Sequence, residues 1–62
     1  MEARFVGKTL GVDVEKEAIM EEFKCNSCRV LHPGDMVTMD YIETRVNICV
    51  VNSNVIERIY IG

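Results

Sequence analysis

The 62-residue sequence contains no tryptophan, one proline, one histidine and only four aromatic residues. A single histidine, with no serine or cysteine arranged beside it as a nucleophile, argues against an enzyme. No apolar run approaches the roughly 20 residues that a membrane-spanning helix needs. The seven lysines and arginines are scattered, and the net charge of -3 disfavours binding to a phosphate backbone. We therefore expect neither catalysis nor a membrane or nucleic-acid partner.

The sequence also lacks a closed set of cysteines and a recognisable targeting segment. Three cysteines, an odd number, favour a reducing compartment over a disulfide framework. The N-terminal stretch MEARFVGKTLGVDVEKEA has no basic start, apolar middle or small-residue cleavage site, so it does not resemble a signal peptide. Unless a leader has been removed, these features favour a cytoplasmic location over secretion. The length indicates one domain, residues 1–62, with a small core.

One helix is predicted in GVDVEKEAIMEEFKCN. Asp13 is the expected N-cap, because its carboxylate can accept from the unpaired amides of the first turn. Glu15 and Glu17 suit the positive end of the helix dipole. Apolar residues spaced by four follow, which indicates an amphipathic helix of about three turns.

Three strands are predicted after the helix, at residues 29–31, 45–51 and 55–61. In RVNICVV, apolar and polar residues alternate, as in a strand with one buried face. Asn52-Ser53-Asn54 consists of residues that favour turns, so the last two strands should form a hairpin. The fold class is therefore α/β (α+β), one helix packed on a small mixed sheet. We expect its inward face to hold Val14, Ala18, Ile19, Phe23, Val30, Val46, Ile48 and Val50.

A long connection, residues 32–44, separates the first two strands, and we call it the arch. If those strands are parallel, a crossover of about a dozen residues is required, and it is usually a helix. Pro33 and Gly34 open the arch, and Val37, Thr38 and Tyr41 favour extended backbone. We therefore expect strands 29–31 and 45–51 to be parallel and bridged by an extended segment that stands off the end of the sheet.

An exposed extended segment is the form in which a protease binds its substrate. It inhibits only when it is rigid beforehand and when its ends stay together after attack. Thr38 and Asp40 flank Met39 with short side chains that accept hydrogen bonds. Arg45, at the start of the next strand, offers five donors in a rigid fork that could hold the arch from inside. From spacing alone, an Arg45 that faces solvent is the commoner alternative.

The segment GDMVTMDYIETRVNI resembles the reactive-site region of the potato inhibitor I family of serine-protease inhibitors, the group of eglin and the barley chymotrypsin inhibitor. The family pattern is a glycine, then Val-Thr-(Met or Leu)-(Asp or Glu), then an arginine that begins the following strand. RVLHPGDMVTMDYI is still more similar to the small fungal elastase inhibitors, which resemble a branch of the same superfold. The final Ile-Gly also resembles the family's ending.

The resemblance implies a serine-protease inhibitor that needs no cofactor or metal. Its reactive-site bond would be Met39–Asp40, with Met39 entering the protease's primary specificity pocket. Asn47 stands where potato inhibitors often carry a second supporting arginine. The implied contacts to the protease are Met36, Val37, Thr38, Tyr41 and Ile42. The implied loop supports are Arg45, Thr38, Asp40, Asn47 and Gly62.

The chemistry of Met39 indicates the kind of protease. A long, unbranched apolar side chain suits a deep apolar pocket and adapts to its shape. It would leave the buried acid of a trypsin-like pocket unpaired. We therefore expect a partner of the subtilisin, chymotrypsin or elastase type.

Two alternatives stay open. The first is an intracellular, non-inhibitory interaction module on the same scaffold, favoured by the absence of a signal peptide and of cysteines near either end. The second is a small zinc-binding domain that uses Cys25, Cys28, His32 and Cys49 as a Cys₃His set. It is the weaker one, because a single CxxC without a second pair is a poor signal.

Overall fold

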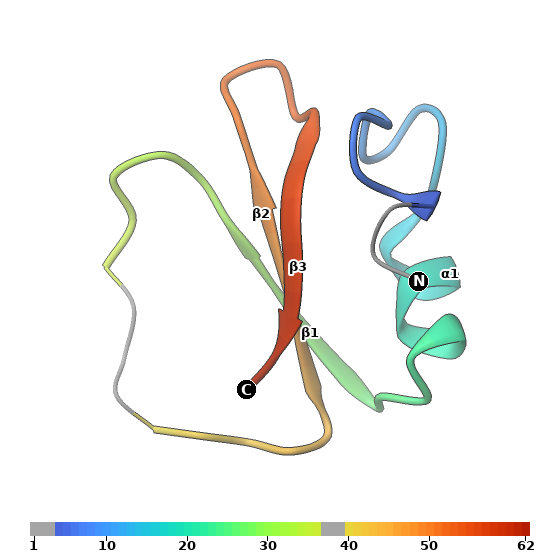
Figure 1. Cartoon of the computed structure of the whole chain (residues 1–62), viewed down its shortest axis with the longest axis vertical. Coiled ribbons are helices and arrows are strands. Elements are labelled where there is room, and N and C mark those ends of the chain that lie inside the picture. Colours follow the sequence, from blue (N-terminus) through green and yellow to red (C-terminus); the bar gives the residue numbers. More distant parts are fainter. Residues whose placement is uncertain (1–3, 37–39) are drawn as a thin grey trace.

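The computed structural model describes residues 4–36 and 40–62, which form one α-helix and three β-strands. In chain order these are α1 (Lys16–Glu22), β1 (Ser27–Leu31), β2 (Arg45–Val50) and β3 (Ile56–Ile61). The strands form one sheet in the order β1-β2-β3 (Figure 1), with β1 parallel and β3 antiparallel to β2. The predicted α+β class, the parallel pair and the hairpin are therefore confirmed.

The sheet separates two unlike layers. On one side lie α1 and the N-terminal segment, and on the other side lies the arch (Figure 1). The chain leaves the end of β3 toward the arch side. Among the described residues, no helix is long and apolar enough to cross a membrane.

The apolar core fills the helix side of the sheet. Side chains alternate between the faces of a strand, so Val46, Ile48 and Val50 of β2 point to the same side. All three are buried, as the alternation in RVNICVV predicts. The buried core cluster consists of Phe5, Ile19, Val46, Ile48, Val50, Ile56 and Ile59.

The predicted inward face is only partly correct. Val14, Phe23 and Val30 are half-buried and pack against the core, whereas Ala18 is exposed. The cause is the position of the helix stripe, which is formed by Ile19, Met20 and Phe23 and leaves Ala18 on the outer side. Phe5, Ile56 and Ile59 complete the core and were not among the predicted residues.

The predicted N-cap at Asp13 is wrong. The helix begins after Glu15, which is its N-cap residue and makes no capping hydrogen bond through its side chain. The carboxylate of Asp13 instead accepts from the backbone N–H of Thr9, at 3.0 Å from Oδ2. A short acidic side chain can accept a hydrogen bond within a turn as readily as it can cap a helix. Asp13 does the former, in the turn that precedes α1.

The end of α1 is closed by a Schellman motif. The N–H of Cys25 donates to the carbonyl of Met20 at 2.8 Å, and that of Lys24 donates to Glu21 at 3.2 Å. Lys24 lies in the left-handed region with φ 56°, a position that glycine usually occupies. A residue with a Cβ is strained there, because the Cβ approaches the following carbonyl oxygen.

Replacing Lys24 with glycine should therefore stabilise the fold. We expect Lys24→Gly to raise the free energy of unfolding by about 0.5–1 kcal/mol, since relief of the left-handed strain exceeds the entropic cost of glycine. Urea denaturation followed by circular dichroism measures the change. The control is Lys24→Ala, which removes the same charge but keeps a Cβ. An equal gain for both variants would show that the charge, and not the backbone, is the cause.

Candidate functional site

Three of the exposed large apolar side chains belong to the arch, whose described legs lie on the side of the sheet opposite α1 (Figure 1). Met36 is 93% exposed, Tyr41 is 70% exposed and Ile42 is 39% exposed. All three are sequence-predicted contact residues. The other predicted contacts, Val37 and Thr38, and the predicted pocket residue Met39 lie outside the described residues.

The first leg of the arch is closed by a tight turn over residues 32–35. The N–H of Asp35 donates to the carbonyl of His32 at 3.0 Å, and Asp35 Oδ2 accepts from the N–H of His32 at 2.9 Å. Pro33 and Gly34 occupy the central positions, with φ 86° at Gly34. This pairing is typical of a type II turn, in which the third residue requires a positive φ.

The second leg is held at the entrance to β2. The N–H of Arg45 donates to the carbonyl of Ile42 at 3.1 Å. The carbonyl of Thr44 accepts from the N–H groups of Asn26 and Ser27, at 3.1 and 3.3 Å. The base of this leg is therefore tied to the start of β1, on the neighbouring parallel strand.

Arg45 lies beneath the arch and connects three parts of the chain. Its Nε donates to the carbonyl of Gly62 at 2.7 Å, and its Nη2 lies 3.4 Å from the carbonyl oxygen of Asp40. Its Nη1 also lies 3.6 Å from Asp40 Oδ2. Only 12% of the Arg45 side chain is exposed, against 52% for Asp40. The alternative in which Arg45 faces solvent is thus not what the structure has.

Asn47 is the second polar side chain under the arch, and it is completely buried. Its Nδ2 donates to the carbonyl of Gly62 at 3.0 Å and lies 3.4 Å from the carbonyl of Tyr60. The N–H of Gly62 donates in turn to the carbonyl of Arg45 at 2.9 Å. The Gly62 carbonyl therefore accepts from both Arg45 and Asn47, which brings together four of the predicted support residues, Asp40, Arg45, Asn47 and Gly62.

The ring of Tyr41 lies against Gly62. A Cβ added to Gly62 would be 3.4 Å from Tyr41 Cε1 and only 3.2 Å from Cδ1, and the second distance is shorter than most carbon–carbon contacts. The φ of Gly62 is 146°, which also disfavours a side chain. Glycine at this position lets the end of β3 pass under the aromatic ring of the arch.

The four proposed zinc ligands are not brought together. His32 and Cys49 line a hollow of about 280 Å³ on the arch side, and neither Cys25 nor Cys28 lines it. Within residues 4–36 and 40–62, no three His, Cys, Asp or Glu side chains are grouped as a metal site. Since all four candidates are described residues, the geometry gives the zinc alternative no support.

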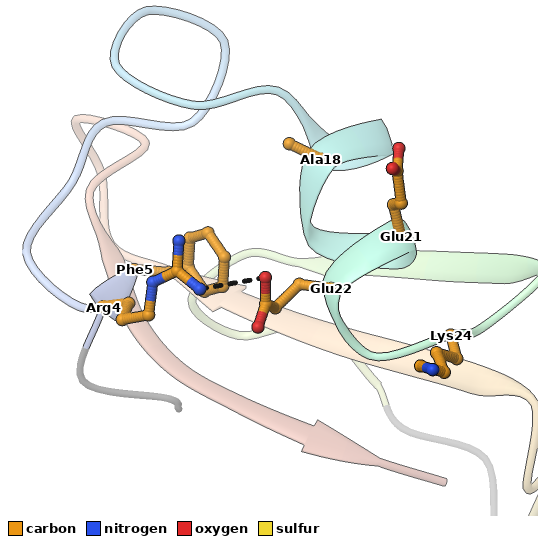
Figure 2. A pocket seen from close by; sticks show the side chains of 6 residues that line it. All are labelled: Arg4, Phe5, Ala18, Glu21, Glu22 and Lys24. Atoms are coloured by element: carbon orange, nitrogen blue, oxygen red, sulfur yellow. Dashed lines mark ion pairs between the residues drawn. The ribbon is translucent and has the colours of Figure 1, made fainter.

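A second hollow, of about 470 Å³, lies on the helix side of the sheet (Figure 2). Its lining carries charges of both signs, and an ion pair of 2.9 Å between Arg4 and Glu22 runs along it. Phe5 forms its inner wall and belongs to the core. Arg4 pairs with Glu22, and its Cζ lies 5.5 Å from the centroid of the Phe5 ring, so the contacts in this hollow hold the N-terminal segment against α1.

The chain is similar to known protease inhibitors over most of its length. The profile of the peptidase inhibitor I78 family matches residues 3–62. Elastase inhibitor AFLEI of Aspergillus flavus is 46% identical over 53 residues, 86% of this chain and 78% of that protein. Elastase inhibitor AFUEI of Aspergillus fumigatus has the same identity over 53 residues, but they make up only 61% of its length. A crystal structure of AFUEI matches with a TM-score of 0.73 and 34% identity, covering 98% of this chain and 82% of that one.

These matches support one half of the resemblance drawn from the sequence. Similarity to the fungal elastase inhibitors is confirmed. Assignment to the potato inhibitor I family is not supported, because I78 is a different family. The residues that suggested it are a loop motif around the arch and the final Ile-Gly, and short motifs of this kind do not decide between families.

The contact between Gly62 and Tyr41 can be tested by adding a single methyl group. Gly62→Ala should displace the Tyr41 ring, because the new Cβ has no room, and the ring proton resonances of Tyr41 should shift. Gly11→Ala is the matched control, since its φ of 89° is also positive but nothing lies within 4 Å of an added Cβ. Both variants should lose about 1 kcal/mol of stability from backbone strain. Unchanged Tyr41 resonances in Gly62→Ala would contradict the contact.

Proposed function

The chain belongs to the peptidase inhibitor I78 family, and we propose that it inhibits a serine protease by presenting its arch as a substrate. The family consists of inhibitors and not of enzymes, and its partner is a protease. The proposed reactive-site bond is Met39–Asp40, with Met39 in the primary specificity pocket. The proposed flanking contacts are Met36, Val37, Thr38, Tyr41 and Ile42.

An elastase-, subtilisin- or chymotrypsin-type protease is the proposed target. The relatives that match most of this chain are named elastase inhibitors, which supports an elastase-type enzyme. The flexible apolar side chain of Met39 supports the same choice, because all three protease types accept apolar residues in their pockets. An acid-lined trypsin-like pocket would be left with an unpaired charge.

The observation that carries this proposal is the connection of Asp40 through Arg45 to the end of β3. Arg45 is nearly buried, with one short bond to Gly62 and two longer contacts to Asp40. A segment held in this way loses little conformational entropy when it binds a protease. The fixed bases of both legs, at residues 32–35 and at Thr44, add to the same effect.

The connection also explains how a substrate-like segment resists cleavage. Attack of the protease serine on the Met39 carbonyl would release the amine of Asp40 as leaving group. Contacts from Arg45 to the Asp40 carbonyl and carboxylate would keep that amine close to the acyl group. A retained leaving group returns faster than it diffuses away, so re-formation of the peptide bond competes with hydrolysis.

The direct experiment measures inhibition constants against a pancreatic elastase, a subtilisin, chymotrypsin and trypsin. We expect inhibition of one or more of the first three and little of trypsin. Met39→Lys should redirect inhibition toward trypsin, because the new cation pairs with the acid of its pocket; a gain of at least about tenfold corresponds to about 1.4 kcal/mol. The control is Met36→Lys, which places the same charge on an exposed residue three positions earlier.

Two results would contradict this proposal. If Met36→Lys and Met39→Lys gained equally on trypsin, Met39 would not be the residue that enters the pocket. If the unmodified chain inhibited none of the four enzymes, the non-inhibitory interaction module would replace the proposed function.

Removing Arg45 tests the mechanism. Arg45→Ala deletes one short, shielded, charge-assisted bond to Gly62 and two longer contacts to the half-exposed Asp40, together about 2–3 kcal/mol. Inhibition should weaken by about 30- to 150-fold, and cleavage at Met39–Asp40 should accelerate. Inhibition constants and the rate of cleavage are measured on the same enzyme. The control is Arg58→Ala, which removes an equal charge from β3. If Arg45→Ala inhibited the enzyme and resisted cleavage as well as Arg58→Ala does, this mechanism would be excluded.

A further inference from the structure

We propose that Arg29, on the edge strand β1, is a further positioning residue of the arch and acts through Asn47. The inference rests on the proposed function, since it takes the arch as the inhibitory segment. Arg29 was not among the residues that the sequence suggested. Its role depends on a contact between two strands, which a local sequence pattern does not predict.

The parallel pairing of β1 and β2 brings Arg29 beside Asn47. The two residues are partners in the strand register, so their side chains leave the same face of the sheet, the arch side. Arg29 Nε donates to Asn47 Oδ1 at 2.8 Å. Asn47 is completely buried, so its amide oxygen lies beyond the reach of bulk water.

This contact fixes which way the Asn47 amide points. An asparagine amide has an acceptor on one side and two donors on the other. Here the donor side faces two carbonyl oxygens, those of Gly62 and Tyr60, and the acceptor side faces the N–H of Arg29. Rotating the amide by half a turn would place oxygen against oxygen and N–H against N–H. Arg29 therefore selects the orientation in which Asn47 donates to Gly62.

The chain of contacts continues from Gly62 to the arch. The Gly62 carbonyl accepts from Asn47 and from Arg45, and the guanidinium of Arg45 reaches Asp40. Loss of the Arg29 donor would leave a buried acceptor unsatisfied, and the amide would turn or admit water. The Gly62 carbonyl would then lose one of its two donors. Arg45 would be less firmly placed beneath Asp40 as a result.

The functional test is Arg29→Met, which keeps the aliphatic stem and removes the donor. We expect inhibition of an elastase-type enzyme to weaken by about tenfold, the loss that corresponds to one buried hydrogen bond to a charged group. The control is Arg58→Met, with the same change of charge. Arg58 pairs with Cys49 in the register and stacks on Tyr60 with its Cζ 4.8 Å from the ring centroid. We expect Arg58→Met to change the inhibition constant by less than about twofold.

A double-mutant cycle separates a role through Asn47 from a general loss of charge. In an Asn47→Ala background, Arg29→Met should add less than about a twofold effect, because the partner is already absent. The side-chain amide of Asn47 provides a spectroscopic readout that needs no protease. Its NH₂ resonances should move and exchange at least about tenfold faster in Arg29→Met, while the backbone amide of Ile48 in β2 keeps its protection.

The inference is overturned if Arg29→Met matches Arg58→Met in both inhibition and the Asn47 amide resonances. It is also overturned if the tenfold loss persists in the Asn47→Ala background, because the effect would then travel by another route. If the unmodified chain inhibits no protease, the proposed function fails separately. The backbone amide shifts of Asp40 and Tyr41 then decide: a change in Arg29→Met supports positioning of the arch, and no change excludes it.

Discussion

The hydrogen bond from Arg45 to the carbonyl of Gly62 is the contact on which the arch side of this structure depends. It joins the first residue of β2 to the residue after β3, and the same guanidinium reaches Asp40. A cation that is nearly buried is stable only when its donors find acceptors, because its hydration is lost. The bond therefore sets two things together: where the end of the chain lies, and where the second leg of the arch begins.

The topology of the sheet explains why so long a segment is available at all. Parallel strands need a long crossover, and in most proteins a helix supplies it. Here α1 precedes β1 and covers one face of the sheet, so the crossover is left for the other face. Asn47 is buried on that second face although it lies opposite the apolar core. One side of the sheet thus carries the apolar core, and the other side carries the polar side chains of Arg45 and Asn47, of which Arg45 reaches Asp40 of the arch.

The sequence predicted what local periodicity and connection length determine. The alternation in β2 and the hairpin follow from patterns within a few residues of one another. The need for a long crossover between parallel strands follows from the length of the connection. The predictions failed, or missed a contact, where a side chain could form either of two local hydrogen bonds or where its partner is distant in the sequence. Asp13 accepts a hydrogen bond from the backbone N–H of Thr9 instead of capping the helix. Arg29 and Asn47 are 18 positions apart, so a short sequence pattern does not reveal their hydrogen bond.

The Gly62 carbonyl accepts from an asparagine, Asn47, and from one arginine, Arg45, rather than from two arginines. An arginine brings its own charge and several donors, whereas an amide has one acceptor that must also be satisfied once it is buried. In this chain Arg29 Nε satisfies the acceptor, so the positive charge lies on the neighbouring strand β1 and its contact with Asn47 is to a neutral amide. A neutral amide costs less to bury than a second cation beside Arg45, and it avoids repulsion between like charges. The arrangement keeps two donors on the Gly62 carbonyl, the amide of Asn47 and the guanidinium of Arg45, and the same guanidinium reaches Asp40.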